Sequence, residues 1–353
     1  MLIRSLEYQL IRSERKEPFF IATGSSNVAH NIIVKIKTDE GMGIGSACPN
    51  SVTGETAESI AGVFKILSQA LIGKDAGDIE LTNTEMDALI KGNPSAKAGI
   101  DIALWDLKGK VEGVPVSELL GGGGRQRMLT DMTIGIMGTE ETVEHALLHI
   151  KEGFKALKVK IGLDKERDIE TIKSVREAVG EDIIVRVDAN QGYDVRSAIE
   201  VIRAIEPYDI EQIEQPVAWD DLEGLKEVKE SSSIPITADE AVKTKEDALK
   251  VVENNCADKI NIKLMKCGGI TKALEINKIA GQNGLDTMIG CMSENVVSIA
   301  AGLHFALSQE NVKYADLDSH FALIDDKTRG GCIFEEGFLI PLERPGLGVD
   351  VEI

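Results

Sequence analysis

Charged residues end a series of β-like runs at nearly constant intervals in the middle of the chain. The runs are KALKVKIG, IIVRVDAN, IEQIEQP, PITADE and KINIK, and their charged ends are Lys160, Asp188, Glu214, Asp239 and Lys263. The steps between these residues are 28, 26, 25 and 24, about the length of one strand, one helix and their loops. So regular a spacing predicts consecutive units of a TIM-like (β/α) barrel, whose strand ends converge on one face.

The chain is longer than one barrel requires. It has 353 residues, whereas a barrel typically takes about 250. Alternating strand-like runs followed by helical runs predict an N-terminal α+β capping domain over residues 1–122. Residues 123–320 are assigned to a modified barrel of class α/β, and residues 321–353 to a tail that packs back on the capping domain. Within this scheme residues 16–30 (KEPFFIATGSSNVAH) are expected to form a mobile loop, and the glycines at 121–124 a linker.

Composition excludes several classes of function. A net charge of −20 argues against binding to nucleic acid or to anionic membranes. The chain lacks a run of 18 apolar residues and a signal-like N-terminus, so no membrane association is expected. Its five cysteines are odd in number and include no CxxC pair, which favours free thiols in a reducing compartment. These features predict a cytoplasmic protein.

Three acids stand in the same phase on neighbouring strand ends. Asp188, Glu214 and Asp239 offer only oxygen ligands, the donor set that suits a hard cation such as Mg²⁺ or Mn²⁺. A strand-end acid can also cap the next helix or pair with a lysine. Three acids in phase favour the metal site.

Lysines flank this predicted metal site on two sides. Lys158 and Lys160 are two residues apart on one strand, so both side chains point the same way. If both side chains point into the barrel, burial would lower their pKa toward values at which a lysine can act as a base. The alternative is that both reach solvent past the strand end. Lys263 lies on the sixth strand, opposite the second, so Lys160 and Lys263 should face each other across the metal. Lys266 lies beyond the strand end and is expected to be peripheral.

A pair of acids ends the eighth predicted strand. Asp316 and Asp318 in YADLDSH repeat the same-face spacing of two. Aspartates are common in turns, which is the alternative explanation. Facing a site, the two carboxylates would attract a cation such as a substrate ammonium group.

Together these motifs resemble the enolase superfamily, in its muconate-lactonizing-enzyme subgroup. The resemblance covers nearly the whole chain and includes KVK, VDAN, IEQP, ADE, NIK and the segment at 98–122. It implies a Mg²⁺-bound carboxylate substrate whose α-proton is removed to give an enediolate. By the same resemblance, Lys160 and Lys263 are the acid/base pair, and Lys158 hydrogen-bonds the substrate carboxylate.

Within the subgroup, Asp316-Leu317-Asp318 is similar to the DxD of dipeptide epimerases of the L-Ala-D/L-Glu type, which binds the dipeptide's α-ammonium group. The resemblance implies an isomerase that inverts the Cα of the C-terminal residue of an L,L-dipeptide. Thr133 and Cys291 are further candidates for substrate contact, or equally a polar barrel filler and a core thiol. Because members of the family assemble into dimers or octamers, a homo-oligomer is expected.

One departure from the family bears on the substrate. Members acting on L-Ala-L-Glu carry an arginine after a Pro-Phe-x-x-Ala stretch, whereas PFFIATGS places Gly24 or a small neighbour there. The nearest cations, Arg15 and Lys16, precede the loop. An apolar or small C-terminal side chain is therefore favoured over glutamate.

Other functions share this scaffold. An o-succinylbenzoate synthase or N-succinylamino-acid racemase would use the same lysines and metal ligands without needing the DxD. A lactonizing enzyme would act on a substrate without an ammonium group, which Asp316 and Asp318 would repel. Sugar-acid dehydratases of the mandelate-racemase type carry a histidine base after the seventh strand, and GCMSEN has none. A small-molecule binding protein on the same barrel would not need two opposed lysines.

Overall fold

The computed structural model describes residues 1–122 and 124–352. Its centre is an eight-stranded sheet whose strands follow one another in chain order. All the pairings within this sheet are parallel, and an isolated parallel bridge joins Thr130, just before the first strand, to Ala315 of the last strand. The predicted modified (β/α) barrel is thus confirmed. The strands are β5 (Met132–Ile134), β6 (Ala156–Lys160), β7 (Ile184–Asp188), β8 (Ile210–Glu214), β9 (Ile236–Ala238), β10 (Lys259–Lys263), β11 (Asp286–Gly290) and β12 (Val312–Asp316).

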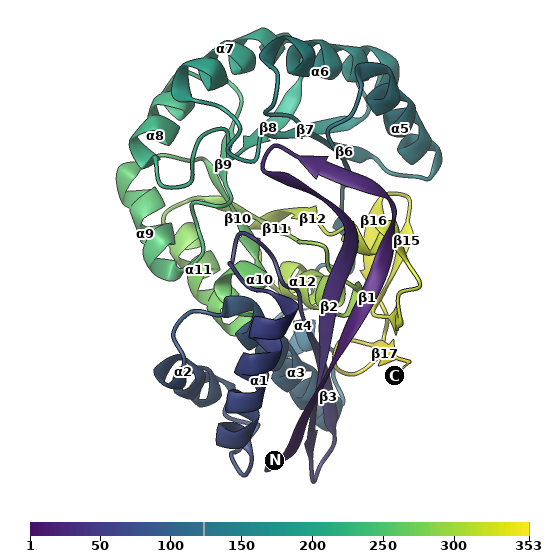
Figure 1. The fold of residues 1–353 in the computed structure, drawn as a ribbon, viewed down its shortest axis with the longest axis vertical. Helices are drawn as coiled ribbons and strands as arrows, with labels where there is room; N and C mark the ends of the chain where they lie inside the picture. The colour runs from purple at the N-terminus through teal and green to yellow at the C-terminus, as the bar shows by residue number, and fades with distance from the viewer. Residues whose placement is uncertain (123, 353) are drawn as a thin grey trace.

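Helices follow the barrel strands and cover the outside of the sheet (Figure 1). Strands β6 and β10 are buried along their whole length, because helices cover one face and barrel side chains fill the other. The helices are α5 (Thr139–Lys151), α6 (Lys165–Val179), α7 (Val195–Ile205), η1 (Glu206–Tyr208), α8 (Leu222–Glu230), α9 (Lys245–Asn254), α10 (Leu264–Cys267), α11 (Ile270–Gln282), α12 (Val296–Ser308) and η2 (Ser319–Ala322).

The capping domain packs a helix directly against a sheet. Its strands are β1 (Ile3–Ile21), β2 (Gly24–Thr38) and β3 (Met42–Ala47), and its helices are α1 (Ala57–Leu71), α2 (Ile79–Leu89), α3 (Pro94–Glu112) and α4 (Val116–Leu119). A Cβ on Gly43 or Gly45 would lie about 2 Å from a backbone carbonyl oxygen of α3. Glycine is required at both positions because the helix backbone approaches β3 this closely.

The expected mobile loop at residues 16–30 is wrong. Strands β1 and β2 continue through it as a hairpin, pairing Phe19 with Ser26 and Ile21 with Gly24 after a bulge that begins at Glu14. Ladder hydrogen bonds outweigh the loop-like composition, and the polar residues face away from the core. The tip reaches across the mouth of the barrel (Figure 1). There the amide of Ile136 donates to the Phe20 carbonyl oxygen at 2.8 Å.

The last segment contacts both the capping domain and the barrel. Val116 N donates to Gly346 O at 3.0 Å, and Gly346 N donates to Val114 O at 3.0 Å. Strand β13 pairs with β1, β14 with β17, and β15–β16 with β4, which precedes the first barrel strand. The strands are β4 (Met128–Leu129), β13 (Leu323–Ile324), β14 (Thr328–Gly330), β15 (Cys332–Glu335), β16 (Phe338–Pro341) and β17 (Val349–Val351).

Two further expectations concern the chain as a whole. No helix among the described residues is long and apolar enough to cross a membrane. All five cysteines are free thiols, and four of them are buried. The predicted glycine linker at 121–124 includes Gly123, which lies outside the described residues.

Candidate active site

The parallel register sets the charged strand ends beside one another. Lys160 pairs with Asp188, and Asp188 pairs with Glu214 on the next strand. Asp239 follows β9 by one residue, while Lys263 is the last residue of β10. The chain therefore brings together at one end of the barrel the residues that its spacing singled out.

The three predicted metal ligands form one compact cluster. Asp188, Glu214 and Asp239 each offer a carboxylate oxygen, and these oxygens all lie within 4.8 Å of one another. All three side chains are buried. Asn190 N donates to Asp188 at 2.8 Å and Asn261 Nδ2 to Glu214 at 2.8 Å, so neutral donors orient two of the carboxylates. An oxygen-only cluster of this kind fits a hard divalent cation.

Lysine ammonium groups contact the same carboxylates. Lys160 Nζ lies 2.6 Å from Asp188 Oδ2, and Lys263 Nζ lies 2.7 Å from Asp239 Oδ2. The two lysines thus flank the acid cluster through different acids. Lys158 Nζ reaches deeper and lies 2.8 Å from both Glu214 Oε2 and Asp316 Oδ2.

The expectation for Lys266 is wrong. The chain turns into the short helix α10 directly after β10, and this turn carries Lys266 back beneath the strand end. The side chain is buried, its ammonium pairs with Asp239, and it donates to the Asn261 carbonyl oxygen at 3.1 Å. Lys266 therefore orients a predicted metal ligand from below.

The expectation that burial lowers the pKa of the lysines of β6 is wrong for Lys158, and Lys263 departs in the same direction. Burial by itself lowers the pKa of Lys263, but the Asp239 and Glu214 carboxylates outweigh it and hold the pKa above its ordinary value. The pKa of Lys158 is likewise raised, because Asp316, Glu214 and Asp188 outweigh its burial. Burial and the neighbouring Asp188 carboxylate raise the pKa of Glu214 to about 8. The pKa values of Asp188 and Asp239 are lowered instead, because the adjacent lysines outweigh burial, so these two acids stay ionised, the form that binds a cation.

A second acidic group lies at the end of β12. Asp318 Oδ2 accepts a hydrogen bond from Thr133 N at 2.6 Å, and Asp316 Oδ1 accepts from Thr133 Oγ1 at 3.3 Å. Cys291 Sγ lies 3.6 Å from Asp318 Oδ1. Burial and the Asp316 charge raise the pKa of Asp318, whereas Lys158 and Lys160 outweigh burial and lower that of Asp316 to about 2. Thr133 and Cys291 thus both contact the acids at the end of β12.

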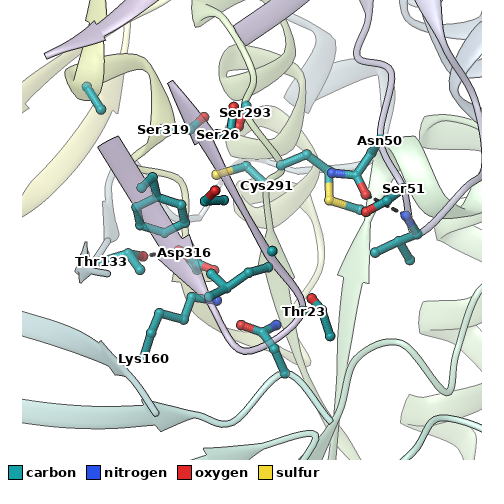
Figure 2. A pocket seen from close by; sticks show the side chains of 18 of the residues that line it. Thr23, Ser26, Asn50, Ser51, Thr133, Lys160, Cys291, Ser293, Asp316 and Ser319 are labelled. Carbon is teal, nitrogen blue, oxygen red and sulfur yellow. Dashed lines mark hydrogen bonds between the residues drawn. The ribbon is translucent and has the colours of Figure 1, made fainter. Parts of the chain in front are cut away.

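A cavity of about 400 Å³ lies between the two flanking lysines and the second acidic group. The barrel side of this cavity is lined by Lys160, Lys263, Thr133, Asp316 and Asp318. The capping-domain side is lined by the tip of the β1–β2 hairpin. Figure 2 shows Thr133 and Asp316 on one side of this main cavity and Thr23 on the other. The site is completed by residues that are far apart in the sequence.

Arg15 is the main residue that the sequence placed wrongly. It lines the main cavity, donates to Ser293 Oγ at 3.2 Å and stacks 4.5 Å from the centre of the Phe19 ring. The strand continues past it, so the side chain reaches the cavity without a loop. The sequence did contain a signal for this position. Arg15 lies two residues after Ser13, so in a continuous strand it shares the face of Ser13, which is buried. Asn261 was missed as well, although it lies two residues before Lys263 and so shares its face.

A buried ion pair forms the floor beneath this site. Arg186 Nη1 donates to Asp131 Oδ2 at 2.8 Å and to the Ala315 carbonyl oxygen at 2.8 Å, and Arg186 Nε donates to Glu211 at 2.6 Å. The guanidinium ties strands β7, β8 and β12 to the segment that precedes β5. Its side chain is 2% exposed.

Two family models together match most of the chain. The mandelate racemase / muconate lactonizing enzyme N-terminal domain matches residues 6–121, and the enolase C-terminal domain-like family matches residues 141–352. The chain belongs to the enolase superfamily. This superfamily member is 41% identical over 353 residues to a hydrophobic dipeptide epimerase from Enterococcus faecalis, with 99% of each chain covered. It is 39% identical over 356 residues to an L-Ala-D/L-Glu epimerase from Clostridium acetobutylicum, again with 99% of each covered.

A solved structure extends the likeness to three dimensions. The crystal structure of the dipeptide epimerase from Enterococcus faecalis, complexed with Mg and L-Leu-L-Tyr, matches with a TM-score of 0.96 at 41% identity, covering 99% of each chain. The enolase-superfamily chain described here is therefore an enzyme of the isomerase class.

Proposed function

We propose that the protein is a Mg²⁺-dependent dipeptide epimerase that inverts the Cα of the C-terminal residue of an L,L-dipeptide. One observation carries the proposal: a single cavity is lined by two lysines, Lys160 and Lys263, and by the acid pair Asp316 and Asp318. The lysines suit proton transfer at a carbon acid, and the acid pair suits an ammonium group. A dipeptide carries both features.

The acid pair would hold the substrate's α-ammonium group. Thr133 fixes both carboxylates through its amide and hydroxyl, so they are aligned before substrate arrives. Lys158, between Asp316 and Glu214, would donate a hydrogen bond to the substrate carboxylate. The ends of the dipeptide would then fix the Cα between the two lysines.

The chemical step is a 1,1-proton transfer. One lysine, as the neutral amine, takes the Cα proton, and the bonding electrons move into the carboxylate to give an enediolate. The other lysine, as the ammonium, returns a proton to the opposite face of the same carbon. Asp188, Glu214 and Asp239 would hold Mg²⁺, with Mn²⁺ as an alternative, and the cation would offset the negative charge of the carboxylate. A bound cation would offset part of the negative charge of Asp239 and Glu214. These carboxylates would then raise the pKa of Lys263 less.

The hairpin supports an apolar or small side chain on the C-terminal residue. Ile21, Thr23 and Gly24 line the main cavity, and a Cβ on Gly24 would meet no atom within 4 Å. Arg15 enters the cavity beside Ser293 and carries an electrostatic interaction with Asp318. This places its charge at the ammonium end rather than beside Thr23.

Deuterium exchange tests the proposal. L,L-dipeptides incubated with the protein and Mg²⁺ in D₂O should gain one deuterium at the C-terminal Cα, measured by mass spectrometry, and EDTA should abolish the gain. The N-acetylated form of an active dipeptide lacks the ammonium group and should exchange far more slowly. Absence of exchange across the whole set would sink the proposal, and N-succinylamino acids and succinylbenzoate precursors would then be tested.

A further inference from the structure

A second pocket opens directly beside the main cavity. It has a volume of about 260 Å³ and lies between the hairpin, β5, helix α5 and the tail. We call it the side pocket. Residues that line both spaces are Arg15, Phe19, Met132, Thr133 and Ala322. Because five residues line both, the side pocket adjoins the main cavity.

The junction of the two spaces lies at the predicted ammonium anchor. Thr133 lines both, and its amide is the donor to Asp318 at 2.6 Å. An ammonium group held by Asp316 and Asp318 therefore sits beside the opening of the side pocket. In a dipeptide the α-ammonium group and the side chain of the first residue are attached to the same carbon. That side chain would therefore lie next to the side pocket.

The deep part of the side pocket is aromatic. Three rings pack on one another: Phe154 lies 4.4 Å from Phe334 and 5.5 Å from Phe321, measured between ring centres. Met132 and Met137 add flexible apolar surface, which adapts to ligands of different shape. This lining suits a large apolar or aromatic side chain.

The charged residues of the side pocket discriminate against a cation. Its two acids contact histidines of α5 at its rim: Glu17 lies 3.5 Å from His145, and Glu152 lies 2.8 Å from His149. The acid side chains are 60% and 50% exposed, so water screens their charge. The guanidinium of Arg15, in contrast, stands at the junction over the Phe19 ring. A lysine or arginine side chain entering here would meet a positive charge first.

We infer that the side pocket binds the side chain of the dipeptide's first residue and selects large apolar or aromatic residues over small and cationic ones. The inference rests on the proposed function. It names a substrate class that the main cavity alone does not define. Burying a large apolar side chain in such a pocket should raise kcat/KM by about 10- to 100-fold over alanine.

A series of dipeptides with one second residue tests the inference. Deuterium exchange would be followed for X-L-Ala, with L-Ala, L-Leu, L-Phe, L-Tyr or L-Lys as X. The expected order places L-Phe, L-Tyr and L-Leu above L-Ala, and L-Lys last. If the dipeptides exchange but kcat/KM does not depend on X, or L-Lys is best, the pocket assignment is overturned while the epimerase remains. If no dipeptide exchanges, the proposed function fails and the inference fails with it.

Two neighbouring leucines of α5 provide matched variants. Leu148 lines the side pocket and Leu147 does not, and they are 47% and 39% exposed, so a larger residue at either position leaves the core intact. Leu148→Trp should lower the ratio of kcat/KM for L-Phe-L-Ala to that for L-Ala-L-Ala by about tenfold or more. Leu147→Trp should leave this ratio unchanged. Equal ratios in both variants would contradict the inference.

Discussion

The buried ion pair beneath the site makes a quantitative prediction about stability. In Arg186→Met, the guanidinium that donates to Asp131 at 2.8 Å and to Glu211 at 2.6 Å is lost. Glu211 is 28% exposed and regains water, but Asp131 is fully buried and cannot. The variant therefore keeps a buried carboxylate that has lost its cation.

The magnitude follows from this asymmetry. Removing one partner of a buried pair costs about 3–5 kcal/mol, because the remaining charge is uncompensated. Adding Asp131→Asn removes that charge and leaves only unmade hydrogen bonds, which cost about 1–3 kcal/mol. The double variant should therefore be more stable than Arg186→Met alone by about 2 kcal/mol, even though it carries one more substitution.

Urea unfolding followed by circular dichroism measures these differences as shifts of the midpoint at constant slope. Arg344 and Asp350 form an exposed bidentate pair at 2.7 and 2.9 Å, so Arg344→Met serves as the control and should cost less than about 1 kcal/mol. If the effects of Arg186→Met and Asp131→Asn simply add, the charge of Asp131 is not what makes the first variant unstable, and the reasoning is refuted.

Three other predictions follow from the site and its surroundings. Lys263→Ala should slow epimerisation about 10²- to 10⁴-fold. Lys160 should still exchange the Cα proton of one of the two epimers. If exchange were lost equally from L,L- and L,D-dipeptides, the two lysines would not act on opposite faces of the Cα. Burial lowers the pKa of His304 from 6.5 to about 4, so the unfolded chain binds a proton between these pH values that the folded chain does not. Stability should therefore fall as pH drops through this window, by roughly 1.4 kcal/mol per pH unit, and His304→Gln should flatten that slope in urea titrations at pH 4.5 to 7. Finally, EDTA should lower the melting temperature by exposing the repulsion among Asp188, Glu214 and Asp239, and Mg²⁺ should restore it; an unchanged melting temperature would argue against a cation at these acids.

The barrel and its charged strand ends could be predicted because both depend on local pattern. A strand of period two followed by a helix fixes which residue ends on the inner face, so Lys160, Asp188 and Glu214 converge whatever their loops do. The same argument placed Asp316 and Asp318. Their roles, like those of the lysines, remain predictions for the experiments above, as do the homo-oligomer and the domain boundaries.

What could not be predicted depends on contacts between distant segments. Arg15 enters the cavity because β1 continues through it, pairing it with Leu323 of β13, whereas composition suggested that the strand ends there and a loop begins at residue 16. Lys266 is buried because a helical turn reverses the chain after β10. The net pKa of Lys263 reflects how many carboxylates pack around its ammonium group, a number that no single strand contains.

The β1–β2 hairpin has a consequence for how such an enzyme diversifies. Arg15, Phe19, Ile21 and residues 23–26 line the main cavity but lie outside the barrel, whose strand ends carry the groups proposed to transfer the proton and bind the cation. Mutations in the hairpin therefore change which side chains are admitted without altering the geometry of the reacting groups. Natural selection can tune preference and chemistry on separate stretches of one gene, so a lineage can pass from one peptide to another through active intermediates.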